Sequence, residues 1–147
     1  TGTGVANPNN ALGALSAAGT TPPDASSAEI NDTADTLILD LGVRVPENGT
    51  IVLSSARDGG AAGDNARVNI QFSTDNITYS TAVTYGASPA TYVSTVQDVL
   101  ERNNVIAPSG GARYIRFTTA NGDDVFVDGV QYSQICVASP TLTATKT

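Results

Sequence analysis

Oxygen-bearing side chains in one glycine-rich loop are the first candidates for chemistry in this sequence. Asp58, Asp64 and Asn65 stand within the ten residues RDGGAAGDNA, at 57–66. Carboxylate and amide oxygens on a flexible loop are ligands that suit Ca²⁺, although the spacing is not that of an EF-hand. The loop is therefore a candidate Ca²⁺ site, and a solvated acidic loop without a metal is the alternative.

Catalysis has few residue types to draw on. The chain has no His, and its only lysine, Lys146, is in the C-terminal tail. The absence of His excludes Ser-His-Asp, Cys-His and His-metal arrangements. Paired carboxylates can act in glycosidases, but most acidic residues here fall in turn sequences such as PPD and NGDD, where Asp favours the turn itself. We predict a protein that is not an enzyme and has no catalytic residues.

The charge and composition limit the classes of binding partner and the cellular location that the sequence favours. The net charge is −7 with only 7 Lys and Arg, and the chain lacks Met. An acidic surface without a basic cluster argues against nucleic acid, and no stretch is apolar enough to span a membrane. The absence of an initiator Met predicts a processed chain, with a removed signal peptide as the simplest cause and a fragment cut from a larger protein as the alternative. Low Lys, many Thr and Asn and an acidic surface indicate an extracellular or cell-surface location. The single cysteine, Cys136, is read as a small buried hydrophobe.

Hydrophobic alternation predicts a chain of short strands. Runs of β-branched residues between turn signals indicate strands at 36–42, 49–56, 67–74, 77–85, 112–119 and 125–138. One helix is expected within 88–104, capped by Ser94 and ended by Asn103 and Asn104. The NGDD turn predicts that 112–117 and 125–132 pair as antiparallel neighbours. The expected fold is an all-β antiparallel β-sandwich with one short helix.

The same alternation predicts which side chains form the core. Inward-facing positions of these strands are Leu39, Leu41, Val68, Ile70, Phe72, Ile115, Phe117, Val127 and Val130.

The segment ARYIRF, at 112–117, concentrates arginines and aromatics in a chain that has few of them. Tyr114 and Arg116 would cover the outer face of the sheet, with the arginine stem packed on neighbouring strands. Arg113 or Arg116 could pair with Asp40 or Asp128 across the sheet. A ligand-gripping arginine is the alternative.

Four motifs in order carry a family resemblance. They are LILDLG (37–42), VNIQFSTDNITYS (68–80), GARYIRF (111–117) and VFVDGVQYSQI (125–135). Together they resemble the galactose-binding-like jelly roll of discoidin (coagulation-factor C-type) domains, in a form typical of bacterial cell-surface modules. The resemblance covers roughly 5–137 and implies an antiparallel jelly-roll β-sandwich. The chain departs from discoidin domains because it has no Trp and a single Cys, so the match is to the fold superfamily.

The resemblance also implies a second place for calcium. Related jelly rolls often hold a structural Ca²⁺ near the loop that leads into the first strands. In this sequence the matching carboxylates are Asp24, Asp32 and Asp35.

The two ends of the chain are predicted to lie outside the domain. The expected division is an N-terminal tail that could act as an assembly strand, one jelly-roll domain, and a strand-like C-terminal tail or linker, with bounds 1–10, 11–138 and 139–147. The tail SPTLTATKT alternates and has high β-propensity, so it can add to an exposed sheet edge. Leu142 and Ala144 are its expected contacts, and Val5 is the anchor of the competing N-terminal strand.

Two functions from different classes fit these observations. The leading hypothesis is a non-catalytic extracellular structural subunit that polymerises head-to-tail with copies of itself, through terminal-strand contacts, into a surface filament. The alternative is a carbohydrate-binding or spacer module of a surface adhesin, with glycans as partners. For a sugar platform the only plausible aromatics are Tyr79, Tyr85 and Tyr92. The sequence itself does not identify the ligand.

Overall fold

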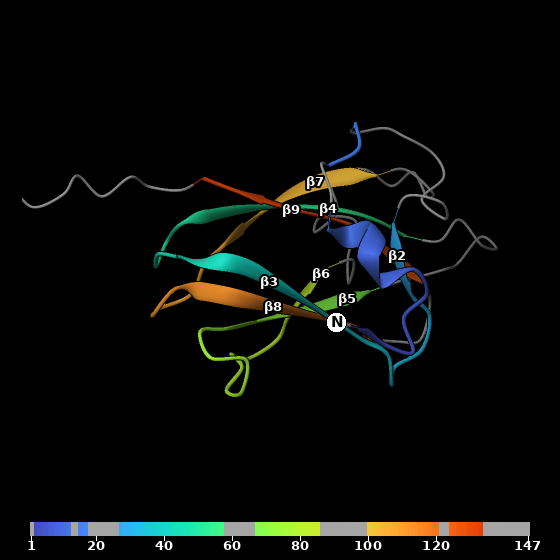
Figure 1. Cartoon of the computed structure of the whole chain (residues 1–147), viewed down its shortest axis with the longest axis horizontal. Coiled ribbons are helices and arrows are strands. Elements are labelled where there is room, and N and C mark those ends of the chain that lie inside the picture. The colour runs from blue at the N-terminus through green and yellow to red at the C-terminus, as the bar shows by residue number, and fades with distance from the viewer. Residues whose placement is uncertain are drawn as a thin grey trace, which may run out of the picture.

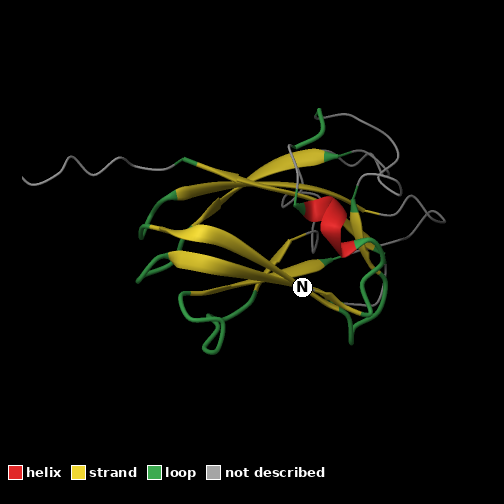
Figure 2. Ribbon diagram, in the orientation of Figure 1, coloured by secondary structure: helices red, strands yellow, loops and turns green. Residues whose placement is uncertain are grey.

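The computed structural model describes residues 2–12, 15–17, 27–57, 67–85, 100–120 and 124–133. Within these residues the chain forms nine strands and one short 3-10 turn, with no other helix (Figure 2). The elements are β1 (Gly2–Thr3), η1 (Pro8–Ala11), β2 (Ala28–Ile30), β3 (Thr36–Val45), β4 (Thr50–Arg57), β5 (Val68–Ser73), β6 (Val83–Tyr85), β7 (Glu101–Ile106), β8 (Ala112–Thr119) and β9 (Val125–Tyr132).

The strands build two antiparallel sheets that lie face to face (Figure 1). One sheet has the order β1-β3-β8-β5-β6, and the other has the order β2-β9-β4-β7. Neighbours in each sheet are mostly far apart in sequence, as they are in Greek-key sandwiches. The predicted antiparallel jelly-roll sandwich is confirmed. No helix in the described part of the chain is both long and apolar enough to cross a membrane.

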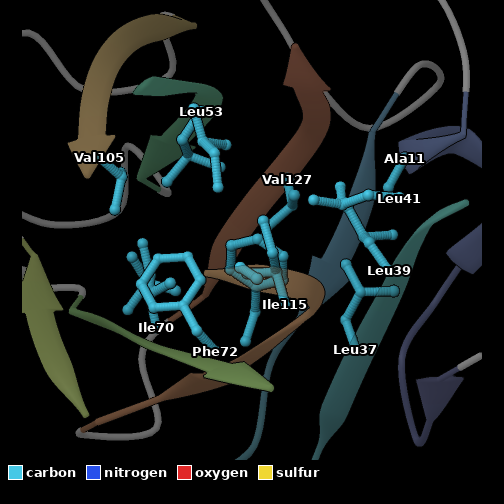
Figure 3. Close-up of a cluster of buried hydrophobic side chains, with 14 of the residues drawn as sticks. Ala11, Leu37, Leu39, Leu41, Leu53, Ile70, Phe72, Val105, Ile115 and Val127 are labelled. Carbon is cyan, nitrogen blue, oxygen red and sulfur yellow. The ribbon is translucent and has the colours of Figure 1, made fainter. Parts of the chain in front are cut away.

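The core lies between the two sheets and matches the alternation of the sequence (Figure 3). Along β5 and β8 the buried residues alternate with partly exposed ones. Every predicted core residue is buried except Val130, which is partly buried against the others. The predicted core is therefore confirmed. The cavity between the sheets that Ile51, Phe117 and Val130 help to line has no room for a water molecule.

The first long strand continues past the residue predicted to end it. Gly42 adopts φ +72 within β3, and the pairing of β3 with β8 shifts between Asp40 and Val45. A glycine with positive φ allows a bulge, and a bulge bends a strand without ending it. The strand thereby reaches the turn at 46–49.

The predicted pairing of 112–117 with 125–132 is wrong, because β8 and β9 lie in opposite sheets. β8 is hydrogen-bonded on both sides, to β3 and β5, and β9 is hydrogen-bonded on both sides, to β2 and β4. Neither strand has a free edge for the other. Ile115 and Phe117 of β8 instead share the core with Val127 of β9. Because β8 and β9 lie in opposite sheets, their buried faces pack against each other. In a hairpin the two strands would lie side by side in one sheet.

The end of the predicted helix is also wrong. Glu101–Ile106 is β7, which pairs antiparallel with β4 over six residues. Asn103 and Val105 are buried while the residues between and after them are exposed, which is the two-residue period of a strand. Backbone pairing to β4 prevails here over the helix-like spacing of the sequence. The preceding residues of that segment, 88–99, lie outside the described residues.

The N-terminal segment pairs with its own domain. β1 lies beside β3, with Gly2 opposite Leu37, and Ala6 forms a bridge with Glu29 at the edge of β2. Val5 is 9% exposed and belongs to the core. Its predicted role in assembly stays a prediction.

Candidate functional site

Three turns meet at one end of the sandwich, toward the left of Figure 1. They are 46–49 between β3 and β4, 107–111 between β7 and β8, and 74–82 between β5 and β6. The first two are joined by backbone hydrogen bonds from the N–H of Asn48 to the carbonyl of Ala107 (3.1 Å) and from the N–H of Ala107 to the carbonyl of Gly49 (2.9 Å). We call this region the loop end.

The loop end contains a pocket with a volume of about 240 Å³. One wall comes from the end of β5 and the segment that follows it, and the other comes from the turn before β8. The lining residues are Phe72, Ser73, Thr74, Thr78, Tyr79, Ser80, Pro108, Ser109 and Gly111. Among these described residues, five carry aliphatic hydroxyls, one carries a phenol, and none carries a charge.

The first wall is shaped by a short turn that Asp75 organises. The Oδ1 atom of Asp75 accepts hydrogen bonds from the backbone N–H groups of Ile77 (2.8 Å) and Thr78 (2.9 Å) and from the hydroxyl of Ser73 (2.8 Å). Ser73 Oγ in turn accepts the N–H of Asn76 at 3.0 Å. Asp side chains commonly stabilise turns in this way. The two backbone N–H groups, followed by Ser73, hold the pKa of Asp75 at about 2.

Ser80 then fastens the segment back onto β5. Its N–H donates to the carbonyl of Phe72 at 2.8 Å, and its hydroxyl accepts the N–H of Phe72 at 3.1 Å. The amide nitrogen of Gln71 donates to the carbonyl of Ser80 at 2.9 Å. These bonds replace strand pairing over 77–82, the first part of the strand predicted at 77–85, and regular pairing with β5 resumes only at β6. The predicted hairpin of β5 is confirmed, but its return strand is short.

Tyr79 is one of two aromatic residues in the pocket lining, with Phe72, and the one with a hydroxyl. The guanidinium of Arg116 lies 4.0 Å from the centre of the Tyr79 ring, and the phenol donates to the Oδ1 atom of Asn76 at 2.5 Å. Burial raises the pKa of Tyr79 above its usual 10, and the charge of Arg116 partly offsets that rise. The ring is therefore held both at its face and at its hydroxyl.

The second wall is the tight turn that precedes β8. The N–H of Gly111 donates to the carbonyl of Pro108 at 2.8 Å. Arg44 of β3 donates from Nε to the carbonyl of Gly110 at 2.8 Å, which ties the turn to the neighbouring strand. Glu47 accepts from the N–H of Gly110 at 3.4 Å. Charged groups thus brace this wall from outside the pocket.

The arginine–carboxylate pairing predicted from ARYIRF is confirmed for one pair. Arg113 binds Asp40, with 3.0 Å between Nε and Oδ1. Arg116 binds Gln71 instead of a carboxylate. Asp128 lies on β9 in the other sheet, where its carboxylate accepts the N–H (2.9 Å) and hydroxyl (2.8 Å) of Ser16. Pairing of Asp128 with either arginine is therefore wrong.

Most of the other predicted site residues lie outside the described residues. They are the candidate calcium ligands Asp24, Asp58, Asp64 and Asn65, the assembly residues Leu142 and Ala144, and the aromatic Tyr92. Asp32 and Asp35 are described, and each accepts a backbone N–H of its own loop, from Ala34 and Asn31 respectively. In the part of the chain that the structure describes, no group of three or more His, Cys, Asp or Glu could hold a metal.

Comparisons with known proteins agree with this architecture. No protein-family model matches the chain, and no curated protein matches it. A solved structure, CBM32-1 from a family 31 glycoside hydrolase from Clostridium perfringens, superimposes with a TM-score of 0.56 at 17% identity, covering 87% of this chain and 84% of that one. The chain therefore shares the antiparallel jelly-roll β-sandwich fold of that module.

A second solved structure overlaps with this chain less well. It is a carbohydrate-binding module, CBM28, specific for non-crystalline cellulose, with 18% identity, 79% of this chain and 72% of that chain covered, and a TM-score of 0.37. That overlap is too small to carry an argument. At these identities the likeness concerns the fold, and the loop-end pocket must be judged on its own residues.

The sequence alone indicates only part of this pocket. Tyr79 is a predicted aromatic contact, whereas nothing in the sequence marks Ser109 and Gly111 as contacts. They join the pocket because β7 and β8 bring their turn beside the segment after β5, and no local pattern in the sequence signals that neighbourhood.

Proposed function

We propose that this chain is a non-catalytic carbohydrate-binding module whose loop-end pocket takes one neutral sugar residue. The observation that carries the proposal is the pocket lining, which combines aliphatic hydroxyls with a fixed tyrosine ring and has no charged side chain among its described residues.

The chemistry of the lining suits a sugar. Each hydroxyl of Ser and Thr can both donate and accept a hydrogen bond, as each hydroxyl of a sugar can. A tyrosine ring offers an apolar face for the C–H groups of a pyranose together with a polar edge. The five hydroxyl-bearing residues and Tyr79 supply both kinds of contact within one pocket.

The size of the pocket limits the ligand. A volume of about 240 Å³ lies just below the ~300–1,000 Å³ of pockets that enclose drug-sized ligands. One sugar ring suits this space better than several. No charged side chain lines the pocket among the described residues, so a sugar carboxylate would lose its water there without gaining an ion pair. We therefore propose a neutral sugar over an acidic one.

The fold supports the same class of function. CBM32-1, the structure that this chain resembles, comes from a glycoside hydrolase. Glycoside hydrolases are enzymes that act on sugars. A binding module needs no base or nucleophile, in keeping with a chain that has no His. An extracellular or cell-surface location belongs to the same proposal, since glycans are abundant there.

The polymerising subunit, the leading hypothesis from the sequence, ranks second. It rested on the C-terminal tail, which lies outside the described residues, and no contact among the described residues favours it. A spacer module remains compatible with the fold and differs from our proposal in having no ligand.

Calorimetric titration with galactose, glucose, mannose, N-acetylglucosamine and glucuronic acid tests the proposal. At least one neutral sugar should bind, and glucuronic acid should bind more weakly than glucose. Tyr79→Ala should weaken that binding at least about tenfold, equivalent to ~1.4 kcal/mol. Tyr114→Ala is the matched control, because Tyr114 lies on β8 without lining the pocket. Absence of binding by every sugar, or equal losses in both variants, would overturn the proposal.

A further inference from the structure

We propose that Arg116 is a positioning residue for the pocket. It packs on one face of the Tyr79 ring, and Gln71 in turn fixes Arg116 by hydrogen bonds. This inference rests on the proposed function for its consequence in binding. The ordering of Tyr79 by Arg116 can be measured without any sugar.

The first step is the contact between Arg116 and Gln71 on neighbouring strands. Arg116 of β8 and Gln71 of β5 are direct cross-strand partners. The Nε and Nη2 atoms of Arg116 both donate to the Oε1 atom of Gln71, at 3.0 Å and 2.7 Å. Two hydrogen bonds to one acceptor fix the plane of a guanidinium, as a single bond to an ammonium group would not.

The second step is the contact between that guanidinium and the pocket. It lies 4.0 Å from the centre of the Tyr79 ring, which is well within the ~6 Å range of cation–π contacts. One face of the ring is thereby occupied. The hydroxyl of Tyr79 is occupied as well, by Asn76, so the orientation of the ring is defined before a ligand arrives.

The third step links the arginine to the wall itself. The two ends of the Gln71 amide serve different partners: Oε1 accepts from Arg116, and Nε2 donates to the carbonyl of Ser80. Ser80 directly follows Tyr79 and is bonded twice to Phe72. One glutamine therefore couples the ring, its supporting cation and the backbone of the wall.

Such coupling matters because ordering a side chain on binding costs free energy. Immobilising a flexible side chain on binding costs roughly 0.5–1.5 kcal/mol, equivalent to about 2- to 13-fold in a binding constant. The cation–π contact is present with and without sugar, so it changes the affinity only by sparing this ordering cost. Loss of Arg116 should weaken sugar binding within that range.

Arg113 provides the matched control on the same strand. Its guanidinium binds Asp40 and lies 5.2 Å from the centre of the Tyr114 ring. It therefore has the charge, the strand and the aromatic neighbour that Arg116 has, without contact to the pocket lining. A general effect of removing positive charge should be the same in both variants.

The experiment compares Arg116→Met, Arg116→Lys, Gln71→Met and Arg113→Met with the unaltered chain. The first readout is NMR of the labelled tyrosine rings and amide exchange at Ile77 and Thr78, without ligand. The second is the affinity for galactose, glucose, mannose and N-acetylglucosamine. Thermal unfolding of each variant reports whether the domain is intact.

We expect Arg116→Met and Gln71→Met to broaden or shift the Tyr79 ring signals and to speed exchange at Ile77 and Thr78. The affinity should fall about 2- to 13-fold, while Arg113→Met changes neither readout. Arg116→Lys should behave much like Arg116→Met, because an ammonium group cannot form the two-bond geometry that orders the Tyr79 ring.

Unchanged Tyr79 signals in folded Arg116→Met would overturn the inference, as would equal effects from Arg113→Met. If the unaltered chain binds no sugar, the proposed function fails, and the ring signals still decide whether Arg116 positions Tyr79. If sugar binds but Arg116→Met binds equally well, the proposed function stands and the positioning role fails.

Discussion

Arg113 of β8 and Asp40 of β3 form a two-point ion pair across neighbouring strands. Nε lies 3.0 Å from Oδ1, and Nη2 lies 3.2 Å from Oδ2. The side chains are 44% and 45% exposed. The hydrogen bond from Arg113, followed by that from the N–H of Gly42, holds the pKa of Asp40 below its usual 3.8. The pair therefore bridges two strands at the surface, where water screens it.

Because the pair is exposed, Asp40→Asn should cost only about 0–1 kcal/mol of unfolding free energy. A lowered pKa means that the contribution is present above about pH 4 and is lost as the pH falls through the folded-state value. Urea unfolding of both proteins at pH 7 and pH 2.5 checks this. The difference should shrink at low pH and in high salt. A loss of several kcal/mol would show that the pair is far better shielded than its exposure indicates.

Phe117→Ala should be the most damaging kind of core substitution in this chain. Phe117 is 0% exposed between the sheets, and removal of a buried Phe side chain typically costs about 3–5 kcal/mol. Ile77→Ala is the control, because Ile77 is 83% exposed and should change stability little. Chemical unfolding of both variants measures the difference. Equal losses would contradict the position of Phe117 in the core.

Gly110 and Gly111 should respond very differently to alanine. Both have positive φ, at +83 and +75, so both substitutions carry a backbone cost of about 1–2 kcal/mol. A Cβ on Gly111 would also lie 2.3 Å from the backbone carbonyl oxygen of Val45, whereas on Gly110 its nearest neighbour is Arg44 at 3.9 Å. Gly111→Ala should therefore lower the melting temperature clearly more than Gly110→Ala. Equal shifts would mean that the turn before β8 relaxes freely away from β3.

Much of the fold could be predicted because alternation is a local property. The inward residues of β5 and β8 follow directly from the two-residue period of a strand, and the structure buries them. The partner of a strand is not a local property. The NGDD turn favoured a hairpin, yet β8 and β9 are each enclosed by two other strands, and burial of both inner faces decided the topology.

The segment 100–104 shows how tertiary pairing can override a helical pattern. Spacing of apolar residues predicted a helix there, but β7 completes the hydrogen bonds of β4, and sheet formation depends on such neighbours more than on the segment itself. The pocket could not be predicted from the sequence for a related reason. Its walls are brought together by turns that are far apart in sequence, so Tyr79 could be suggested from its type, but its contact with Arg116 could not.

The turn that shapes the first wall should resist acid. Asp75 has a pKa of about 2, lowered from 3.8 chiefly by the N–H groups of Ile77 and Thr78. A lowered pKa means that its ionised form stabilises the turn above about pH 4 and that this contribution is lost as the pH falls through about 2. Amide shifts of Ile77 and Thr78 should stay constant from pH 7 to pH 4 and change below pH 3. A midpoint near 4 would show that these hydrogen bonds are absent in solution.

The most direct test of the account is to map sugar binding onto the backbone by NMR. Amide signals of the chain are followed during titration with galactose, glucose, mannose and N-acetylglucosamine. We expect saturable shifts from one of these sugars, confined to the two walls of the pocket at 72–80 and 108–111, and lost in folded Tyr79→Ala. No shift with any sugar, or shifts gathered on another face of the sandwich, would contradict the proposal that the loop-end pocket is the binding site.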